Sequence, residues 1–277
     1  MNRISFFAKP PFELRHLQRV SSIIRGEQIA AHMYDARLNP TSGYENDVCI
    51  YVKPHVKPGD DFNFEGHPYL DMVDGFQLWH LLRKRPEIPA IVVSDHSAET
   101  MSHYIKNKII IIPHHHINFE RVKRDRGNTV RNVGMIGSEY AFQYIPDEIK
   151  QGLANRRLKL VTHSVMFPRM TVTKFYSKMD VMLVWSPYNS IETPALYNPF
   201  KMVNASAFGI PTIALDKPAF HEMKDTYFPV HNVEEFFKAL DNLRSDQGLY
   251  QHMSEICLEK AEKYHIDNIA KLYSELT

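Results

Sequence analysis

Short apolar runs alternate with helical patterns along the first half of the chain. Five runs rich in Ile and Val predict β-strands, at residues 4–8, 29–33, 48–52, 90–94 and 108–112. Apolar residues recurring at helical spacing predict a helix over 71–83 (Met72, Phe76, Trp79 and Leu82) and another over 14–24. Because strands alternate with helices, we expect parallel α/β units.

The alternation restarts after a charged stretch without periodicity at 119–128, which predicts a linker. Strands are expected at 129–136, 158–162, 181–185 and 212–215, and helices at 171–177 and 199–208. Asn232, with Glu235 three residues on, caps a further amphipathic helix. We therefore predict two Rossmann-like domains, 1–120 and 128–260, with a C-terminal helix (262–277) packing back on the first.

Residues 197–216 form the most informative segment. Asn198 suits a helix N-cap, Pro199 the first helical position, and Gly209 the left-handed position beyond the helix end. The helix N-terminus presents unpaired N–H groups, so it favours an anion. A cation in the first turn is disfavoured by the helix dipole, and Lys201 therefore suggests that a phosphate binds nearby. The alternative is a solvated lysine on an ordinary helix.

Residues 201–216 resemble the nucleotide-sugar-binding segment of GT-B glycosyltransferases, in which a lysine opens a helix that ends in Ala-x-Gly-x-Pro before a strand ending in Asp. Three further segments are similar in order and spacing, at 91–116, 133–137 and 174–186. The resemblance implies a GT-B-like fold, with two parallel α/β domains facing a cleft. It also implies transfer of a sugar from a nucleoside-diphosphate sugar to a saccharide or other hydroxyl acceptor.

The resemblance implies a donor site in the second domain and an acceptor site in the first. Lys201 would neutralise the diphosphate, so that no metal and no other cofactor is required. The remaining donor-site residues that it implies would contact phosphate (Gly137 and Ser138), phosphate and ribose (Tyr197, Asn198 and Asn204) or the nucleobase (His163, Ser164 and Ser186).

Two departures from the family pattern affect the expected chemistry. Retaining members commonly carry two glutamates eight positions apart, where this chain has Leu196 and Asn204. The Arg and Lys that usually follow the first strand of the second domain are not evident after Gly137. The stereochemical outcome, retaining or inverting, therefore stays open.

The side chains that activate the acceptor are expected where strands of the first domain end, because ligands of open α/β sheets bind beyond the carboxyl ends of the strands. Neutral imidazoles or carboxylates there can accept the proton of an acceptor hydroxyl. The candidates of this type are His16, Asp35, Asp95 and His96.

Composition narrows the partners and the compartment. The chain has 277 residues with 33 Lys plus Arg against 32 Asp plus Glu, so bulk nucleic-acid binding is not expected. Two cysteines far apart, an N-terminal apolar run too short for a secretory signal and no membrane-spanning stretch favour a cytoplasmic protein. Residues 114–116 are three successive histidines at the end of a predicted strand. Adjacent side chains there are expected to point in alternate directions, which argues against binding of one metal ion by all three.

Two other functions fit the same fold. A sugar-nucleotide epimerase or hydrolase would share the diphosphate site but act without an acceptor. A catalytically degenerate transferase-like protein would bind the nucleotide sugar without turning it over. The missing glutamates and missing Arg–Lys pair are compatible with that second alternative.

Overall fold

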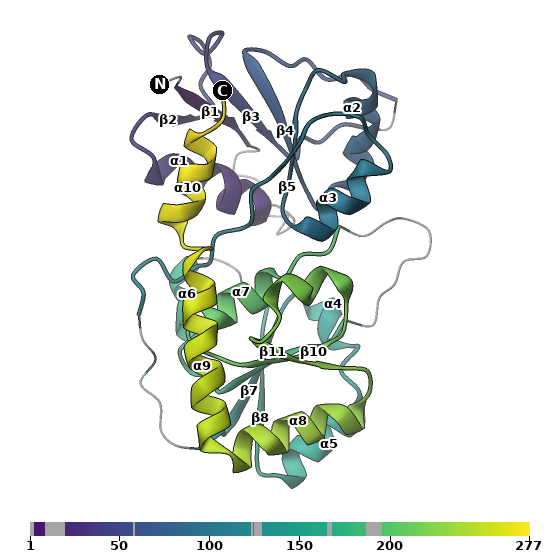
Figure 1. Cartoon of the computed structure of the whole chain (residues 1–277), viewed down its shortest axis with the longest axis vertical. Coiled ribbons are helices and arrows are strands. Elements are labelled where there is room, and N and C mark those ends of the chain that lie inside the picture. Colours follow the sequence, from purple (N-terminus) through teal and green to yellow (C-terminus); the bar gives the residue numbers. More distant parts are fainter. Residues whose placement is uncertain are drawn as a thin grey trace. The chain divides into compact units, whose positions relative to one another are not determined.

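The computed structural model describes residues 3–8, 20–57, 59–122, 124, 129–164, 168–186 and 196–277. The chain divides into two compact units. Unit 1 comprises Met1–His115, Ser190–Asn198 and Ile266–Thr277, and unit 2 comprises His116–Asn189 and Pro199–His265. Each unit is described by itself below, with the element labels of Figure 1.

Unit 1 is built on a parallel sheet with the strand order β2-β1-β3-β4-β5-β6. Its strands are β1 (Ile4–Phe7), β2 (Ala36–Leu38), β3 (Val48–Val52), β4 (His67–Val73), β5 (Ala90–Val92) and β6 (Ile109–Ile111). Its helices are the π-helix η2 (Ser22–Glu27), α1 (Gln28–His32), the 3₁₀ helix η3 (Phe76–Leu78), α2 (Trp79–Lys84), α3 (Asp95–Ser102) and α10 (Ile266–Ser274).

Unit 2 has a second parallel sheet, with the order β11-β10-β9-β7-β8. Its strands are β7 (Asn132–Ile136), β8 (Lys159–His163), β9 (Val181–Val184), β10 (Thr212–Leu215) and β11 (Tyr227–Val230). Its helices are α4 (Glu139–Phe142), α5 (Asp147–Asn155), α6 (Arg169–Tyr176), α7 (Phe200–Ser206), the 3₁₀ helix η4 (Pro218–Met223), α8 (Val233–Ser245) and α9 (Gln247–Glu262).

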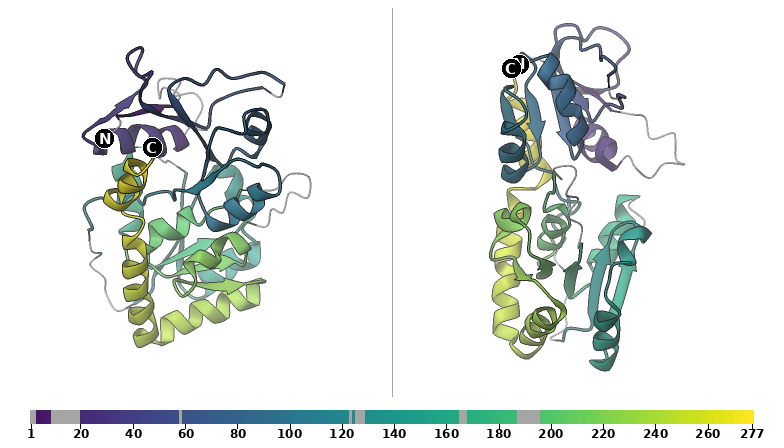
Figure 2. Two further views of the ribbon diagram at one scale, coloured as in Figure 1. Left: turned by 45° about the horizontal axis from the view of Figure 1, so that its top comes forward. Right: turned by 90° about the vertical axis from the view of Figure 1, so that its right-hand side faces the viewer.

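Apolar residues on both faces of the unit 2 sheet explain its near-continuous apolar strands. In β9, Val181 and Leu183 point into a core with α5 and α8, whereas Met182 points into a core with α6 and α7. Side chains alternate between the faces of a strand, so a strand buried on both sides is apolar throughout. Figure 2 shows helices on both sides of the strands.

Two predicted elements of unit 1 are wrong. The run 29–33 is not a strand: residues 28–32 form α1, since short apolar runs are ambiguous and alanines favour helix. The predicted helix over 71–83 begins only at Phe76, because Asp71, Met72 and Val73 complete β4. Asp71 is buried in that strand and pairs with the buried Arg25 of η2. The helical spacing of Met72 with Phe76 therefore extended the predicted helix into the end of the strand.

Most predicted elements of unit 2 are confirmed. The strand predicted at 212–215 is β10, and helices form at the sites of the predicted 171–177 and 199–208 helices. Gly209 has a φ of 66°, in the left-handed region predicted for it. Asn232 caps α8, with its Oδ1 accepting from the Glu235 N–H at 2.9 Å. Four helices (α4, α5, α9 and η4) and β11 were not predicted.

Candidate functional site

The strand order of unit 2 defines where a ligand can bind. From β7 the chain passes first to β8 on one side and then to β9, β10 and β11 on the other, so β7 and β9 are neighbours. In open α/β sheets the crevice beyond the carboxyl ends of such a strand pair is the usual ligand site. Gly137 follows β7 and Ser186 lies two residues beyond β9.

The side chain of Lys201 extends to this crevice. Its Nζ lies 3.2 Å from the position that a β-carbon would occupy at Gly137. Within the described residues, the Lys201 side chain has no hydrogen bond and no ion pair. Burial lowers the pKa of this ammonium group. A partly buried cation without a neutralising carboxylate among the described residues makes this position a candidate anion site.

The helix that carries Lys201 begins one residue later than predicted. Pro199 is the N-cap of α7, and its carbonyl oxygen accepts from the N–H groups of Met202 and Val203 at 2.8 and 2.9 Å. Asn198 is therefore not the cap. Asn198 and Tyr197 belong to unit 1, where the Tyr197 carbonyl accepts from Ser94 Oγ at 3.4 Å.

The loop after β7 holds two predicted phosphate contacts. Gly137 donates its N–H to the carbonyl of His163 at 3.1 Å, which ties the ends of β7 and β8 together. Ser138 is the N-cap of α4, and its Oγ accepts from the Ala141 N–H at 3.3 Å. The serine hydroxyl thus caps α4. Gly137, which has no side chain, lies beside the Lys201 ammonium group.

Three residues predicted to contact the nucleobase lie at strand ends of the same sheet. The His163 ring stacks on Phe175, with centroids 5.0 Å apart. Its Nε2 is buried and has no hydrogen-bond partner among the described residues. Ser164 follows directly and Ser186 lies beyond β9; both are partly buried. The hydrogen-bonding capacity of this ring nitrogen is therefore unused within the described residues.

The side-chain oxygen of Asn204 accepts a hydrogen bond from the backbone of unit 2. Its side chain is 2% exposed, and its Oδ1 accepts from the Ile117 N–H at 2.9 Å. Asn118 in turn donates to the carbonyl of Ala207 at 2.8 Å. The amide of Asn204 thus anchors the first residues of unit 2 to α7.

The four candidate general bases divide into three groups. Asp95 and His96 open α3 directly after β5, at the carboxyl edge of the sheet in unit 1. Asp35 precedes β2, and its carbonyl accepts from the N–H of Ile4, where β1 begins. It therefore lies at the opposite edge, since the strand that was predicted before it is a helix. His16 lies outside the described residues.

Lys217 was not among the residues predicted for the donor site. It lies two residues beyond β10, and its side chain is 7% exposed. Burial, and then the positive charge of Lys201, lower the pKa of Lys217. Its place after a correctly predicted strand was a usable signal, because residues at strand ends line the crevice.

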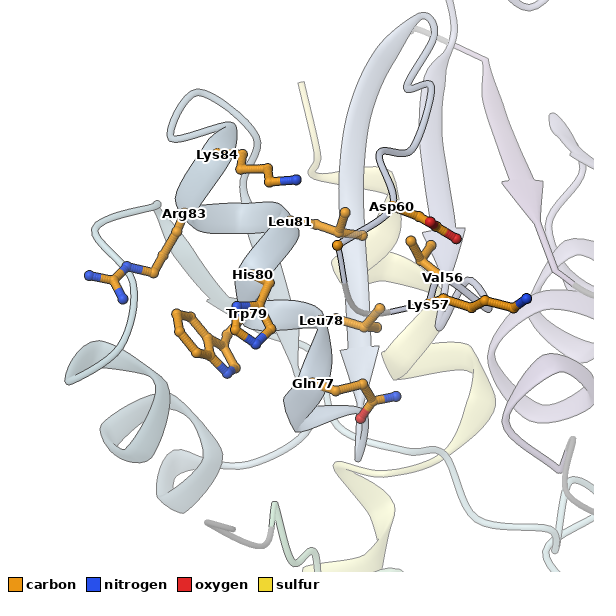
Figure 3. A pocket seen from close by; sticks show the side chains of 11 residues that line it. Val56, Lys57, Asp60, Gln77, Leu78, Trp79, His80, Leu81, Arg83 and Lys84 are labelled. Atoms are coloured by element: carbon orange, nitrogen blue, oxygen red, sulfur yellow. The ribbon is translucent and has the colours of Figure 1, made fainter.

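A cavity of about 310 Å³ in unit 1 involves none of the predicted site residues. It lies between residues 56, 57, 59 and 60 on one side and η3 and α2 on the other, and Figure 3 shows Leu78 and Leu81 pointing toward Val56. Lys57, Asp60 and Lys84 contribute charged groups around this apolar floor. None of the residues predicted to bind the donor lines this cavity.

Two features are absent from the part of the chain described here. No group of three or more His, Cys, Asp or Glu side chains is arranged to hold a metal ion. No helix within those residues is long and apolar enough to span a membrane.

Comparison with solved structures identifies the fold. A glycosyltransferase from Rickettsia africae ESF-5 superposes with a TM-score of 0.61 at 8% identity, covering 99% of this chain and 97% of that one. WaaG, a glycosyltransferase involved in lipopolysaccharide biosynthesis, gives 0.56 at 9% identity, covering 98% of both chains. A chain of the GtfA/B complex superposes with a TM-score of 0.50 at 12% identity. The superposition includes 94% of this chain but only 55% of that one, so this protein spans about half the length of that neighbour.

These neighbours are GT-B glycosyltransferases, and the predicted α/β fold of GT-B type is confirmed. No family model and no curated protein matches the sequence. At 8–12% identity the likeness is one of fold.

Proposed function

We propose that this protein is a glycosyltransferase that moves a sugar from a nucleoside-diphosphate sugar to a hydroxyl acceptor. The observation that carries the proposal is the ammonium group of Lys201 beside Gly137, which no carboxylate among the described residues neutralises, at the point where the strand order of unit 2 reverses. The GT-B fold supports it, since the structural neighbours named above are glycosyltransferases.

Lys201 has a defined task in this reaction. Negative charge accumulates on the diphosphate as the bond to the sugar breaks, and a cation placed beforehand stabilises that charge as it develops. Because Lys201 is partly buried and has no carboxylate partner among the described residues, no counter-ion in that part of the chain screens its charge. Gly137 leaves space for a phosphate oxygen close to the ammonium group.

The remaining roles follow from position. His163 Nε2, buried without a partner in the described residues, is proposed to bond the nucleobase or ribose. The acceptor is assigned to unit 1, where Asp95 and His96 follow β5 and can accept the acceptor proton. The family's glutamate pair is absent here, so the stereochemical outcome is left to experiment.

A two-stage experiment tests the proposal. Thermal denaturation with UDP, GDP, ADP and dTDP, each compared with its nucleoside, identifies the donor base; a ligand at a hundred times its Kd stabilises the fold by about 2.7 kcal/mol. The matching nucleotide sugars are then incubated with and without saccharide acceptors, and free diphosphate and glycosylated product are measured. The Lys201→Gln variant serves as the control.

Each outcome has one interpretation. Acceptor-dependent release of diphosphate together with product supports the transferase. Consumption of the nucleotide sugar without acceptor points to an epimerase or hydrolase, and binding without any turnover points to a degenerate binding protein. Failure of every nucleoside diphosphate to stabilise the protein rejects the site itself.

A further inference from the structure

A carboxylate with a fixed orientation follows β10 in unit 2. Asp216 comes directly after the strand, and its N–H donates to the carbonyl of Val230 at 3.0 Å. One carboxylate oxygen, Oδ1, accepts from the Tyr227 hydroxyl at 3.3 Å and lies 3.3 Å from Nε2 of His221. The other oxygen, Oδ2, has no hydrogen bond within the described residues, and 29% of the side chain is exposed. One oxygen is therefore held in place while the second remains accessible.

The Tyr227 hydroxyl donates to Asp216 over the whole physiological pH range. Burial, and then the charge of Asp216, raise the pKa of Tyr227 to about 12. The phenol therefore keeps its proton, and the carboxylate keeps the donor that orients it.

The strand register places Asp216 at the edge of the sheet that carries the Lys201 site. Continued past the strand ends, the pairings of β10 with β9 and of β9 with β7 bring Asp216 and Gly137 to within one residue of the same level. The two positions are two strands apart, which is about 10 Å at a strand spacing of about 4.8 Å. The Lys201 ammonium group lies beside Gly137. A group attached to a phosphate at Lys201 can therefore extend to Asp216.

Charge determines which part of a nucleotide sugar can lie at Asp216. The carboxylate repels a phosphate, so the diphosphate belongs at Lys201. Sugar hydroxyls are neutral donors, and a carboxylate oxygen accepts from such donors in charge-assisted hydrogen bonds. The two charges of opposite sign at this edge thus match a ligand whose anionic part is joined to a neutral, hydroxyl-bearing part.

We infer that Asp216 is a specificity-determining residue that binds a hydroxyl group of the donor sugar through Oδ2, with Tyr227 holding the carboxylate in position. This inference rests on the proposed function and deepens it, because it assigns a contact to the sugar itself. It predicts that affinity for the sugar depends on residue 216, whereas affinity for the diphosphate does not.

Three variants separate the sugar contact from its surroundings. Asp216→Asn removes the charge, keeps the size of the side chain and retains an oxygen that can accept from Tyr227. Tyr227→Phe leaves the carboxylate intact but removes the bond that orients it. Asp241→Asn is the matched control, because Asp241 is a carboxylate of the same unit that pairs with Arg156. Arg156 lies shortly before β8, at the opposite edge of the sheet.

Titration calorimetry compares UDP, GDP, ADP and dTDP with their glucose and mannose conjugates. In the wild-type protein the hexose should add affinity to the preferred diphosphate. Asp216→Asn should weaken binding of the nucleotide hexose about tenfold or more. Binding of the diphosphate alone should be unchanged or tighter, since a negative charge near the phosphates is removed. Tyr227→Phe should weaken only the nucleotide hexose, by a smaller factor, and Asp241→Asn should change neither.

Analogues of the preferred nucleotide hexose that lack one hydroxyl identify the group that is bonded. One deoxy analogue should bind the wild-type protein about tenfold more weakly than the parent compound. Asp216→Asn should no longer distinguish the two compounds. The comparison is a double-mutant cycle, and a residue that acts only on stability does not produce this loss of discrimination. Equal discrimination by wild type and variant for every analogue overturns the inference.

The remaining outcomes distinguish this inference from the proposed function. If Asp216→Asn weakens the diphosphate and the nucleotide hexose by the same factor, or binds both as Asp241→Asn does, the role of Asp216 is rejected and the Lys201 site stands. Loss of folding in Asp216→Asn but not in Asp241→Asn also overturns the inference, because the side chain is then structural. If the wild-type protein binds no nucleoside diphosphate and no nucleotide hexose, both proposals are rejected.

Discussion

The ammonium group of Lys201 lies 3.2 Å from the position that a β-carbon would take at Gly137. That separation is tighter than ordinary van der Waals contact, yet the group that would have to move is the end of a flexible side chain. A methyl group at residue 137 would therefore displace the ammonium group while leaving the β7 backbone in place. This relationship allows the anion site to be perturbed separately from the fold.

Gly137→Ala should weaken diphosphate binding with little loss of stability. We expect the Kd for the best nucleoside diphosphate to rise about tenfold, since charge-assisted bonds depend steeply on geometry, while the melting temperature changes little. Gly248→Ala, near the start of α9, where the added β-carbon would lie 3.3 Å from Asp246 Oδ1, is the control for an added methyl group away from Lys201. Gly134→Ala should instead destabilise the protein by about 1–3 kcal/mol, because its β-carbon would lie 2.5 Å from Met179 Cγ. Unchanged affinity in Gly137→Ala would count against the site.

As pH rises, the affinity for a diphosphate should begin to fall at a lower pH than the one at which exposed lysines lose their protons. Burial lowers the pKa of Lys201, so in the free protein this ammonium group loses its proton at a lower pH than an exposed lysine does. An anion binds the protonated form, and affinity is therefore full below the lowered pKa and is lost as pH rises through it. Above about pH 7 a nucleoside diphosphate is fully ionised and adds little pH dependence of its own.

Titration calorimetry at a series of pH values measures this effect, and proton uptake on binding is expected in buffers of different ionisation enthalpy. A Kd that stays constant until the pH at which exposed lysines lose their protons would contradict the assignment.

The buried pair of Asp71 and Arg25 should dominate the stability of unit 1. Asp71 Oδ2 also accepts from the hydroxyl of Tyr273 in α10 at 3.2 Å. Asp71→Asn leaves the buried guanidinium without its counter-charge and should cost about 3–5 kcal/mol, whereas Tyr273→Phe should cost about 1 kcal/mol. Asp74→Asn, which breaks the surface pair with Lys53, is the control and should cost at most about 1 kcal/mol. Urea unfolding followed by circular dichroism ranks the three, and equal losses in Asp71→Asn and Asp74→Asn would refute the ranking.

Asn204→Ala should reduce stability without a selective loss of donor binding. The substitution leaves the N–H of Ile117 without its acceptor, 2.9 Å away in the wild type, and should cost about 1–3 kcal/mol. Affinities for a nucleoside diphosphate and for its 2′-deoxy analogue, measured well below the melting temperature, should fall by the same small factor. A loss confined to the ribonucleotide would instead assign Asn204 to the ribose.

Among the candidate bases, Asp35 should be dispensable. It lies before β2, at the opposite edge of the sheet from Asp95 and His96, so Asp35→Asn should keep kcat within about twofold. A true general base among Asp95, His96 and His16 should lower kcat by about 10²–10⁴-fold on substitution, with donor Kd nearly intact. Single-turnover transfer by the four variants measures this. Near-normal kcat in all of them would exclude a side-chain base from this set.

The sequence by itself determined the elements whose causes are local. The strands at 48–52 and 212–215 were predicted with their observed bounds, because continuous apolar runs there need no distant partner to be recognised. The cap of α8 at Asn232 and the positive φ of Gly209 involve only neighbours within a few residues. Lys201 was predicted as a phosphate contact by the same local reasoning, from its place in the first turn of a helix with clear start and end signals, and this role stays a prediction.

Tertiary structure decided what depends on residues far apart in the chain. Asp71 is part of a strand because Arg25 and Tyr273, 46 and 202 positions away, satisfy its buried charge. Lys217 lies near Lys201 because parallel pairing of β7, β9 and β10 brings their carboxyl ends to one edge. Neither relationship can be recognised from a periodic pattern in the sequence. Burial of a charge and pairing of strands depend on partners that the local sequence does not contain.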